Sequence, residues 1–191
     1  MNRFDIPEDT FIGGWFMPEN IIDEVNDYFD SMKHKLKPGT QGRKKINKDV
    51  KESLDLGVDF NDYEPPFLEY RKSNQHILDN YLNVFKRANE NDAFGIKENI
   101  NIQHYPVGGG FKIWHHENKG SLPVGRDRHL TFMTYLNDVD DGGTEFLYQK
   151  ITIPAKKGLT IVWPTQWTHT HRGQISHTKE KRIITGWYNF I

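Results

Sequence analysis

The sequence contains no cysteine, and this absence removes several kinds of site. Disulfide bonds, thiolate metal sites and a cysteine nucleophile are all excluded. Any metal ion must therefore be held by histidine and carboxylate side chains, a donor set typical of iron, manganese or zinc.

Long apolar runs and an excess of charge of one sign are missing as well. No hydrophobic run approaches the length of a membrane span, and residues 1–12 lack the apolar centre of a signal peptide. The formal net charge of −1 gives no reason to expect binding to nucleic acid or to a membrane surface. We therefore expect a cytoplasmic protein with no nucleic-acid or membrane partner, and the sequence leaves the oligomeric state open.

The composition is that of a folded protein, because 36% of the 191 residues are hydrophobic and 27% are charged. This length predicts a single domain over residues 1–191, which the residue pattern divides into two parts. Residues 1–98 are expected to be mainly helical support and loop. Residues 99–191 are expected to form a β-rich core.

Two segments of the first part have apolar residues at helical spacing. They cover about residues 18–32 and 65–87, and each opens with proline, which suits a helix start. Between them, residues 33–51 are basic and interrupted by glycine, which predicts a mobile loop. This loop is either simply solvated or a lid that closes over an extended substrate.

The second part consists of short strand-like runs separated by turn signals such as Asp141-Gly142-Gly143. The predicted strands cover residues 100–105, 111–114, 130–136, 144–146, 151–154, 159–163 and 183–190. Helices followed by short strands predict an α+β domain whose strands close into a barrel or a sandwich.

Seven of the nine histidines lie in the second part. The strand-like pattern of residues 114–118 puts His115 and Glu117 on the same side, because alternate residues of a strand face the same way. A second, distant histidine would complete a two-histidine, one-carboxylate site that leaves positions open on an oxygen-activating Fe(II). A His-x-Glu pair by itself is more often an ordinary surface pair.

Other residues compete for these roles. His116 and Asn118 form the alternative register, but they lack the carboxylate that holds a hard cation well. His169 and His171 are both candidates for the distal ligand, and strand parity does not choose between them. Gly173 allows a tight turn directly after the second of them.

Lys181 opens the last predicted strand. It shares a strand face with Ile183, Thr185 and Trp187. A cation with a nearby hydroxyl on an otherwise apolar face suits a carboxylate of a small dicarboxylic acid. Taken alone, Lys181 also fits a solvated charge in the polar run of residues 179–182.

Five blocks of residues follow one another over residues 101–190, nearly half of the chain. They are Tyr105-Pro-Val-Gly108 ahead of His115-x-Glu117, Arg128-x-x-Thr131-x-x-x-Tyr135-Leu-Asn137, Gly142-Gly143-Thr144-x-Phe146, His171-x-Gly173, and Lys181 with Thr185 and Trp187. In this order they resemble the prolyl 4-hydroxylase-like branch of the Fe(II)/2-oxoglutarate-dependent dioxygenases.

The resemblance implies a double-stranded β-helix, a jelly-roll or cupin-like barrel, with supporting N-terminal helices. It implies Fe(II) bound by His115, Glu117 and His171, with 2-oxoglutarate and O2 as cosubstrates. His171 is preferred to His169 because the His-x-Gly motif and the spacing to the basic residue fit it. The implied reaction is hydroxylation of a C–H bond, and the implied substrate is a prolyl residue in a peptide or protein.

The resemblance also assigns the pocket. Lys181 is expected to bind the far carboxylate of 2-oxoglutarate, helped by Tyr135 and Thr185, and Tyr105 is expected to line the same pocket. The predicted substrate-binding residues are Arg128 and Trp187, of which Arg128 matches an arginine that approaches the substrate in prolyl hydroxylases. The tryptophans at 163, 167 and 187 are candidates for a dry pocket wall or for the core.

One departure from the family is chemical: Glu117 stands where the usual ligand is aspartate, so its carboxylate lies one methylene farther from the backbone. Three other functions stay open. They are a metal-binding jelly-roll module without oxygenase activity, an oxygenase acting on a small molecule, and a cupin-like metal hydrolase or isomerase. The hydrolase or isomerase would not need Lys181, Tyr135 and Thr185 to converge.

Overall fold

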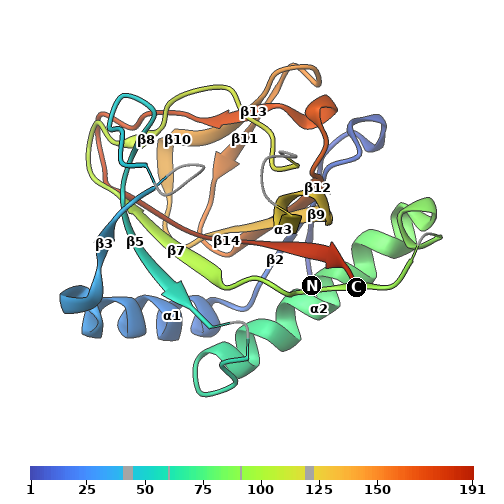
Figure 1. Ribbon diagram of the computed structural model, residues 1–191, viewed down its shortest axis with the longest axis horizontal. Coiled ribbons are helices and arrows are strands. Elements are labelled where there is room, and N and C mark those ends of the chain that lie inside the picture. Colours follow the sequence, from blue (N-terminus) through green and yellow to red (C-terminus); the bar gives the residue numbers. More distant parts are fainter. Residues whose placement is uncertain (41–44, 60, 91, 119–122) are drawn as a thin grey trace.

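The computed structural model describes residues 1–40, 45–59, 61–90, 92–118 and 123–191. Its strands form two antiparallel sheets that face each other, and two long helices pack on the outer side of the larger sheet (Figure 1). The large sheet has the order β1-β2-β12-β9-β14-β7-β5-β3, with β6 beside β14. The small sheet has the order β11-β10-β13, and a separate pair joins β4 to β8.

The strands of the large sheet are β1 (Arg3–Phe4), β2 (Gly13–Phe16), β3 (Lys37–Pro38), β5 (Leu54–Val58), β6 (Phe94–Gly95), β7 (Ile100–Tyr105), β9 (Arg128–Tyr135), β12 (Leu159–Pro164) and β14 (Lys181–Phe190). The remaining strands are β4 (Lys51–Glu52), β8 (Gly110–Phe111), β10 (Val139–Phe146), β11 (Ile151–Ala155) and β13 (His171–Gly173). The helices are α1 (Glu19–Ser31), α2 (Phe67–Val84) and the short α3 (Pro123–Arg126). Short 3-10 helices cover Glu8–Thr10, Lys33–Lys35, Lys86–Asn89 and Trp167–His169.

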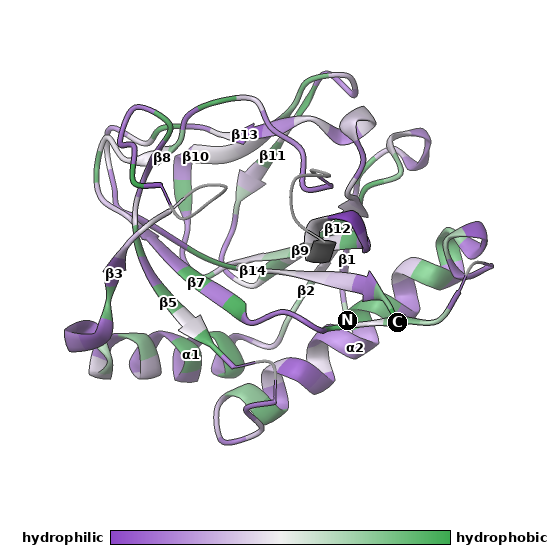
Figure 2. Cartoon of the chain, in the orientation of Figure 1, coloured by the Kyte–Doolittle hydropathy of each residue, from purple (hydrophilic) through white to green (hydrophobic). Residues whose placement is uncertain are grey.

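The large sheet separates two hydrophobic layers, because side chains alternate between the faces of a strand. On β9, Phe132 packs in the layer under the helices, whereas Met133 and Tyr135 pack in the layer between the two sheets. On β12, Val162 and Trp163 divide in the same way. Figure 2 shows this mixture of hydrophobic and hydrophilic residues along the strands. The pocket described below opens from the layer between the sheets.

The two long helices are amphipathic and cover the outer face of the large sheet (Figure 1). The buried residues of α1 lie on one face of the helix and are Ile21, Ile22, Val25 and Phe29. From α2, the hydroxyl of Tyr70 reaches the Thr134 hydroxyl at 2.8 Å, which in turn meets the Thr160 hydroxyl at 2.8 Å. This chain satisfies buried hydroxyls between helix and sheet. No helix in the described part of the chain has the length and apolar character that crossing a membrane requires.

The α+β class and both long helices are confirmed, and of the two predicted forms, a closed barrel or a sandwich, the structure shows the sandwich. In the described residues, the edge strands β11 and β13 form no ladder with the large sheet. The two sheets therefore pack face to face through side chains, and the jelly-roll architecture is an open one.

Three local predictions also change. The predicted turn at residues 141–143 lies inside β10, where the pairing register with β11 shifts between Val139 and Thr144. The predicted strand 111–114 shortens to the last residue of β8. The predicted loop 33–51 contains a 3-10 helix, β3 and the first residue of β4, while its residues 41–44 lie outside the described part. In addition to these three changes, residues 1–98, expected to be mainly helix and loop, contribute β1, β2, β3, β5 and β6 to the large sheet.

Candidate metal centre

Backbone pairing places the two histidines of the predicted site next to each other. His171 opens β13 and pairs with Phe146 of β10. His115 then joins His171 in an isolated antiparallel bridge, with N–O distances of 3.0 and 2.8 Å between their backbones. Glu117 follows two residues later, so that its side chain returns to the same side as His115. The three side chains offer ligand atoms that all lie within 4.8 Å of one another.

Hydrogen bonds fix the tautomer of both imidazoles. Nδ1 of His115 lies 3.0 Å from the carbonyl oxygen of Ile113, and Nδ1 of His171 lies 2.9 Å from that of His169. A carbonyl only accepts, so each Nδ1 must carry the proton that is donated. When the rings are neutral, each Nε2 is left with a lone pair. Outer partners of this kind commonly orient metal-binding histidines.

The lone pairs converge on one oxygen of Glu117. Oε1 lies 3.4 Å from Nε2 of His115 and 3.5 Å from Nε2 of His171. All three groups are acceptors when the rings are neutral, and acceptors that face one another need a cation or protons between them. Two imidazole nitrogens and one carboxylate oxygen form the facial donor set of non-haem Fe(II). The residues present therefore fit that metal.

Burial and mutual contact shift the titration of these groups in opposite directions. Burial lowers the pKa of His115, and the nearby His171 lowers it further, so the His115 ring is neutral at neutral pH. Burial alone would raise the pKa of Glu117. Hydrogen bonds and charge interactions from the protonated forms of the two histidines outweigh burial and hold that pKa well below the usual range. A neutral ring beside an ionised carboxylate is the protonation state that binds a metal.

The competing histidines are oriented differently. His169 uses both ring nitrogens, since Nε2 lies 3.0 Å from the carbonyl oxygen of Thr10 and Nδ1 lies 3.1 Å from the Thr168 hydroxyl. His116 lines the same cavity but does not belong to the group of converging ligand atoms. The geometry thus favours His171 over His169, as the sequence motif does.

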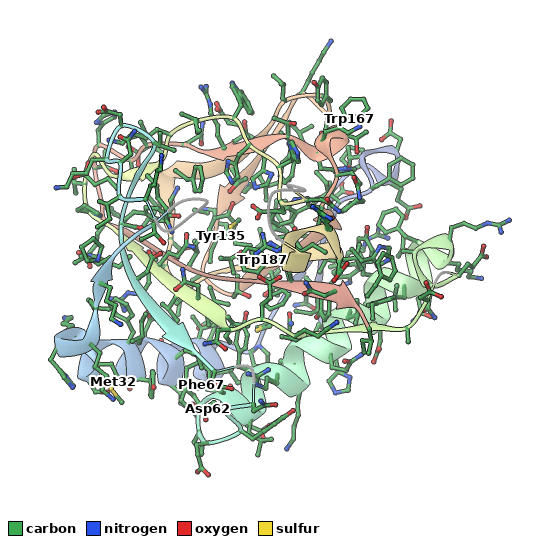
Figure 3. All side chains as sticks on the ribbon, viewed as in Figure 1. Met32, Asp62, Phe67, Tyr135, Trp167 and Trp187 are labelled. Carbon is green, nitrogen blue, oxygen red and sulfur yellow. The ribbon has the colours of Figure 1, made fainter. Side chains whose placement is uncertain are left out.

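A cavity of about 1070 Å³ opens in front of this group. Its lining includes the three candidate ligands and all the predicted cosubstrate residues, which are Tyr105, Tyr135, Lys181 and Thr185. Arg128, Trp163 and Trp187 line it too, whereas Trp167 is 60% exposed and does not. Figure 3 shows Tyr135 and Trp187 near the middle of the molecule and Trp167 at its edge. The expected role of Trp167 as a pocket wall is therefore wrong.

Lys181 is a buried cation with backbone partners only. Its Nζ donates to the carbonyl oxygens of Gly142 at 2.8 Å and Gln174 at 2.9 Å, and it lies 5.4 Å from the centre of the Tyr105 ring. No described carboxylate forms an ion pair with it. Burial lowers the pKa of Lys181 to about 8, although the charge of Asp141 acts in the opposite direction. A buried ammonium without an anionic partner is a prepared site for a carboxylate.

Protein contacts hold the hydroxyl groups around Lys181 in place. The Tyr135 hydroxyl donates to Thr144 Oγ1 at 2.7 Å, and the Thr185 hydroxyl donates to the carbonyl oxygen of Phe132 at 3.3 Å. The Tyr105 hydroxyl donates to the side-chain oxygen of Gln103 in a short contact. Burial raises the pKa of Tyr105 and of Tyr135, so both phenols stay protonated and able to donate.

The two residues predicted to bind substrate, Arg128 and Trp187, both contact Glu117, which is a candidate metal ligand. Arg128 Nη1 lies 3.3 Å from Oε2 of Glu117, and Nε1 of Trp187 lies 3.0 Å from the same oxygen. Glu98, which the sequence patterns did not single out, binds Arg128 with N–O distances of 2.8 and 2.6 Å. No spacing signal marks Glu98, because it lies 30 residues from its partner in the chain.

Comparisons with known proteins agree with this geometry. Residues 100–189 match the model of the 2OG-Fe(II) oxygenase superfamily. No curated protein matches the chain in sequence.

Solved structures share the fold at low sequence identity. A prolyl-4-hydroxylase from Pseudomonas putida is 15% identical with a TM-score of 0.69, and the match covers 94% of this chain and 92% of that one. A viral collagen prolyl hydroxylase from Paramecium Bursaria Chlorella virus-1, solved with 2OG, is 18% identical with a TM-score of 0.69, over 98% and 100% of the two chains. A prolyl hydroxylase from Trichoplax adhaerens, in complex with a peptide fragment of the hypoxia inducible factor oxygen degradation domain, is 16% identical with a TM-score of 0.73, over 95% and 84%.

The donor set of His115, Glu117 and His171 fits the Fe(II), 2-oxoglutarate and O2 that this superfamily uses. The matched residues 100–189 contain every one of these ligand candidates, together with Lys181, which lines the same cavity. Residues 100–189 thus match the 2OG-Fe(II) oxygenase superfamily, and the chain shares the fold of the prolyl hydroxylases.

Proposed function

We propose that this protein is a hydroxylase that couples oxidative decarboxylation of 2-oxoglutarate to hydroxylation of a C–H bond in a prolyl residue of a peptide or protein. One observation carries the proposal. Two Nε2 lone pairs and one carboxylate oxygen converge in the lining of a cavity, and a buried lysine without an ion-pair partner among the described residues lines the same cavity. A metal-bound oxo acid with a second carboxylate satisfies both features at once.

The side chains of the chain have separable roles in this reaction. His115, Glu117 and His171 would hold Fe(II), which together with 2-oxoglutarate and O2 supplies the oxidising chemistry that yields succinate, CO2 and the alcohol. Lys181 would bind the far carboxylate of 2-oxoglutarate and so fix its orientation. The Tyr135 hydroxyl would support that carboxylate. Positioning of the reactants is the contribution of the protein, since the metal performs the difficult step.

Apolar side chains limit the access of water to this end of the cavity. Trp163 is 1% exposed, and its ring lies 5.1 Å from that of His171, while Phe146 packs against both rings. The ring of Phe111 stacks on His115, with 3.7 Å between the ring centres. A dry environment strengthens the electrostatic contacts to the bound acid.

The size of the cavity supports a large substrate. Its volume of about 1070 Å³ exceeds the volume of a five-carbon acid. Its lining extends to Lys51 of β4 and Asp55 of β5. Peptide hydroxylation is further supported by the shared fold with three prolyl hydroxylases, one of them bound to a peptide. Lys45 also lines the cavity and belongs to residues 33–51, which the sequence predicts to be either a solvated loop or a lid. Closure of these residues over a peptide stays a prediction.

The experiment combines binding and turnover. Anaerobic addition of Fe(II) and 2-oxoglutarate should give a weak visible metal-to-ligand charge-transfer band, and its absence would favour a binding module without oxygenase activity. Succinate release is then measured against a panel of proline-containing peptides, with mass spectrometry for the gain of one oxygen. Succinate release without a gain of oxygen on any peptide of the panel would refute the peptide substrate. Metal binding without any succinate would point to a hydrolase or isomerase.

A further inference from the structure

The two carboxylate oxygens of Glu117 have different surroundings. Oε1 faces the two histidines, whereas Oε2 accepts hydrogen bonds from Trp187 Nε1 at 3.0 Å and from Arg128 Nη1 at 3.3 Å. The same Arg128 nitrogen lies 3.2 Å from the backbone oxygen of Glu117. Side chain and main chain of this one residue are thus held from the same side.

The residues that hold Oε2 are themselves held firmly. The guanidinium of Arg128 lies 3.5 Å from the centre of the Trp187 ring and binds both oxygens of Glu98. Asn189 donates to Glu98 at 2.9 Å. Arg128 and Asn189 are partners in the pairing of β9 with β14, so the large sheet fixes the backbone positions of both residues that hold Glu98. The side chains of Arg128 and Glu98 are 17% and 14% exposed, which limits screening of their ion pair.

We propose that Glu98, Arg128 and Trp187 form a clamp that fixes the carboxylate of Glu117 so that Oε1 alone is presented to the metal. This inference rests on the proposed function, because it assumes that the site binds Fe(II). Arg128 and Trp187 are then positioning residues that act through Glu117, in addition to any contact with substrate.

The clamp also explains why this site has glutamate. A glutamate carboxylate on a flexible two-carbon side chain has more orientations than an aspartate, and two donors on Oε2 remove that freedom before the metal arrives. Shortening the side chain to aspartate retracts the carboxylate by about 1.5 Å, the length of one C–C bond. The shorter group cannot reach Oε1's position beside the histidines and the indole N–H together.

The test uses Co(II), whose visible d–d spectrum reports the geometry of its ligands. Trp187→Phe is the sharpest single variant, since it removes the N–H donor and part of the indole but keeps an aromatic ring beside Arg128. The double variant Glu98→Gln/Arg128→Gln removes the ion pair without changing the net charge, which separates positioning from the repulsion between Arg128 and the metal. We expect Co(II) affinity to fall by about 10- to 100-fold in the double variant and by about tenfold in Trp187→Phe, with a changed d–d spectrum in both.

A matched control exists on the other side of the large sheet. Arg182 binds Asp30 at 3.1 Å and lies 4.2 Å from the centre of the Phe29 ring, and it is 12% exposed. Asp30→Asn/Arg182→Gln therefore removes a similar ion pair and a similar cation–π contact far from Glu117. This control should leave the Co(II) affinity and spectrum unchanged. Circular dichroism of each apoprotein shows whether it is folded, and the single variant Trp187→Phe carries the test if the double variant is not.

A double-mutant cycle with Glu117→Asp shows whether Trp187 acts through Glu117. We expect Trp187→Phe to cost less than about threefold in Co(II) affinity once the carboxylate is shortened, because the indole then has no oxygen to hold. The proposal is overturned if both clamp variants bind Co(II) like the wild type with unchanged spectra. It is equally overturned if Trp187→Phe has its full effect in the aspartate background. A wild-type protein that binds no Co(II) would instead refute the proposed function itself.

Discussion

Replacing Lys181 with methionine separates the cost of burying a charge from its use in binding. Lys181 is 4% exposed, and burial lowers its pKa from 10.5 to about 8. The folded pKa lies below the unfolded one, so this cost is present below pH 8 and fades as the pH rises toward 10.5; at pH 7 it is about 3 kcal/mol. The substitution removes it but leaves the carbonyl oxygens of Gly142 and Gln174 without their donor, at about 1 kcal/mol each. The apoprotein should therefore be as stable as the wild type or slightly more stable.

The same substitution should nearly abolish binding of 2-oxoglutarate. Removing one partner of a buried, hydrogen-bonded charge pair costs about 2–5 kcal/mol, which corresponds to about 30-fold to several thousand-fold in the dissociation constant. Calorimetric titration in the presence of Mn(II) measures this loss, and thermal denaturation of the apoprotein measures the stability.

Lys156→Met is the control, because Lys156 is 46% exposed and only faces Asp140 at 3.6 Å. It should change neither binding nor stability. If Lys181→Met bound 2-oxoglutarate within about threefold of the wild type, the far carboxylate would lie elsewhere and the assignment of Lys181 would be refuted. A large loss of apoprotein stability would show that the buried charge is not a burden.

The structure makes three further predictions. Affinity for 2-oxoglutarate should be constant below pH 8 and fall about tenfold per pH unit above it, because an anion binds the charged form of Lys181, whose pKa is about 8 in the free protein. Lys181→Arg should remove this fall. A wild-type affinity profile that stays flat to pH 10 would contradict the prediction. His169→Gln should keep Co(II) affinity within about threefold, whereas His171→Gln should lose it; the reverse order would make His169 the ligand. Tyr70→Phe should lower the free energy of unfolding, measured in urea, by about 1–3 kcal/mol, because the Thr134 hydroxyl loses a buried partner. The dissociation constant of 2-oxoglutarate should not change. An unchanged free energy of unfolding would show that the chain of hydroxyls contributes nothing to stability.

Periodicity and local parity predicted the parts of this protein that depend on neighbours in the chain. The helical spacing gave α1 and α2, and alternation gave β7, β9, β12 and β14 within a few residues. The pairing of His115 with Glu117 followed from strand parity, because both ligands belong to one short segment. Likewise, the face shared by Lys181 and Thr185 was predicted from one strand and lines the cavity.

Features set by distant partners were not predictable from local pattern. β2 begins with Gly13-Gly14 and β5 contains Asp55 and Gly57, so neither has a strand-like sequence, and each forms because a long strand of the large sheet lies beside it. The strand β10 continues through Gly142-Gly143, since a register shift absorbs the irregular residues. Glu98 was missed for a related reason: its role depends on the pairing of β9 and β14, which brings Arg128 within its reach.

The candidate site is also a junction between the two sheets. His171 belongs to the small sheet through its pairing with β10, whereas Lys181, Arg128 and Trp187 belong to the large sheet. Glu117 contacts both, with Oε1 toward His171 and Oε2 toward Arg128 and Trp187. No backbone ladder joins the sheets in the described residues, so these polar contacts and the layer of buried side chains hold them together.

A metal bound by His171 and Glu117, and an acid bound by Lys181, would add to this packing. Each stabilises only the folded form, and at a hundred times its dissociation constant such a ligand contributes about 2.7 kcal/mol. Ligand binding at this cavity and the stability of the fold should therefore be coupled, because the two ligands together would contact residues of both sheets.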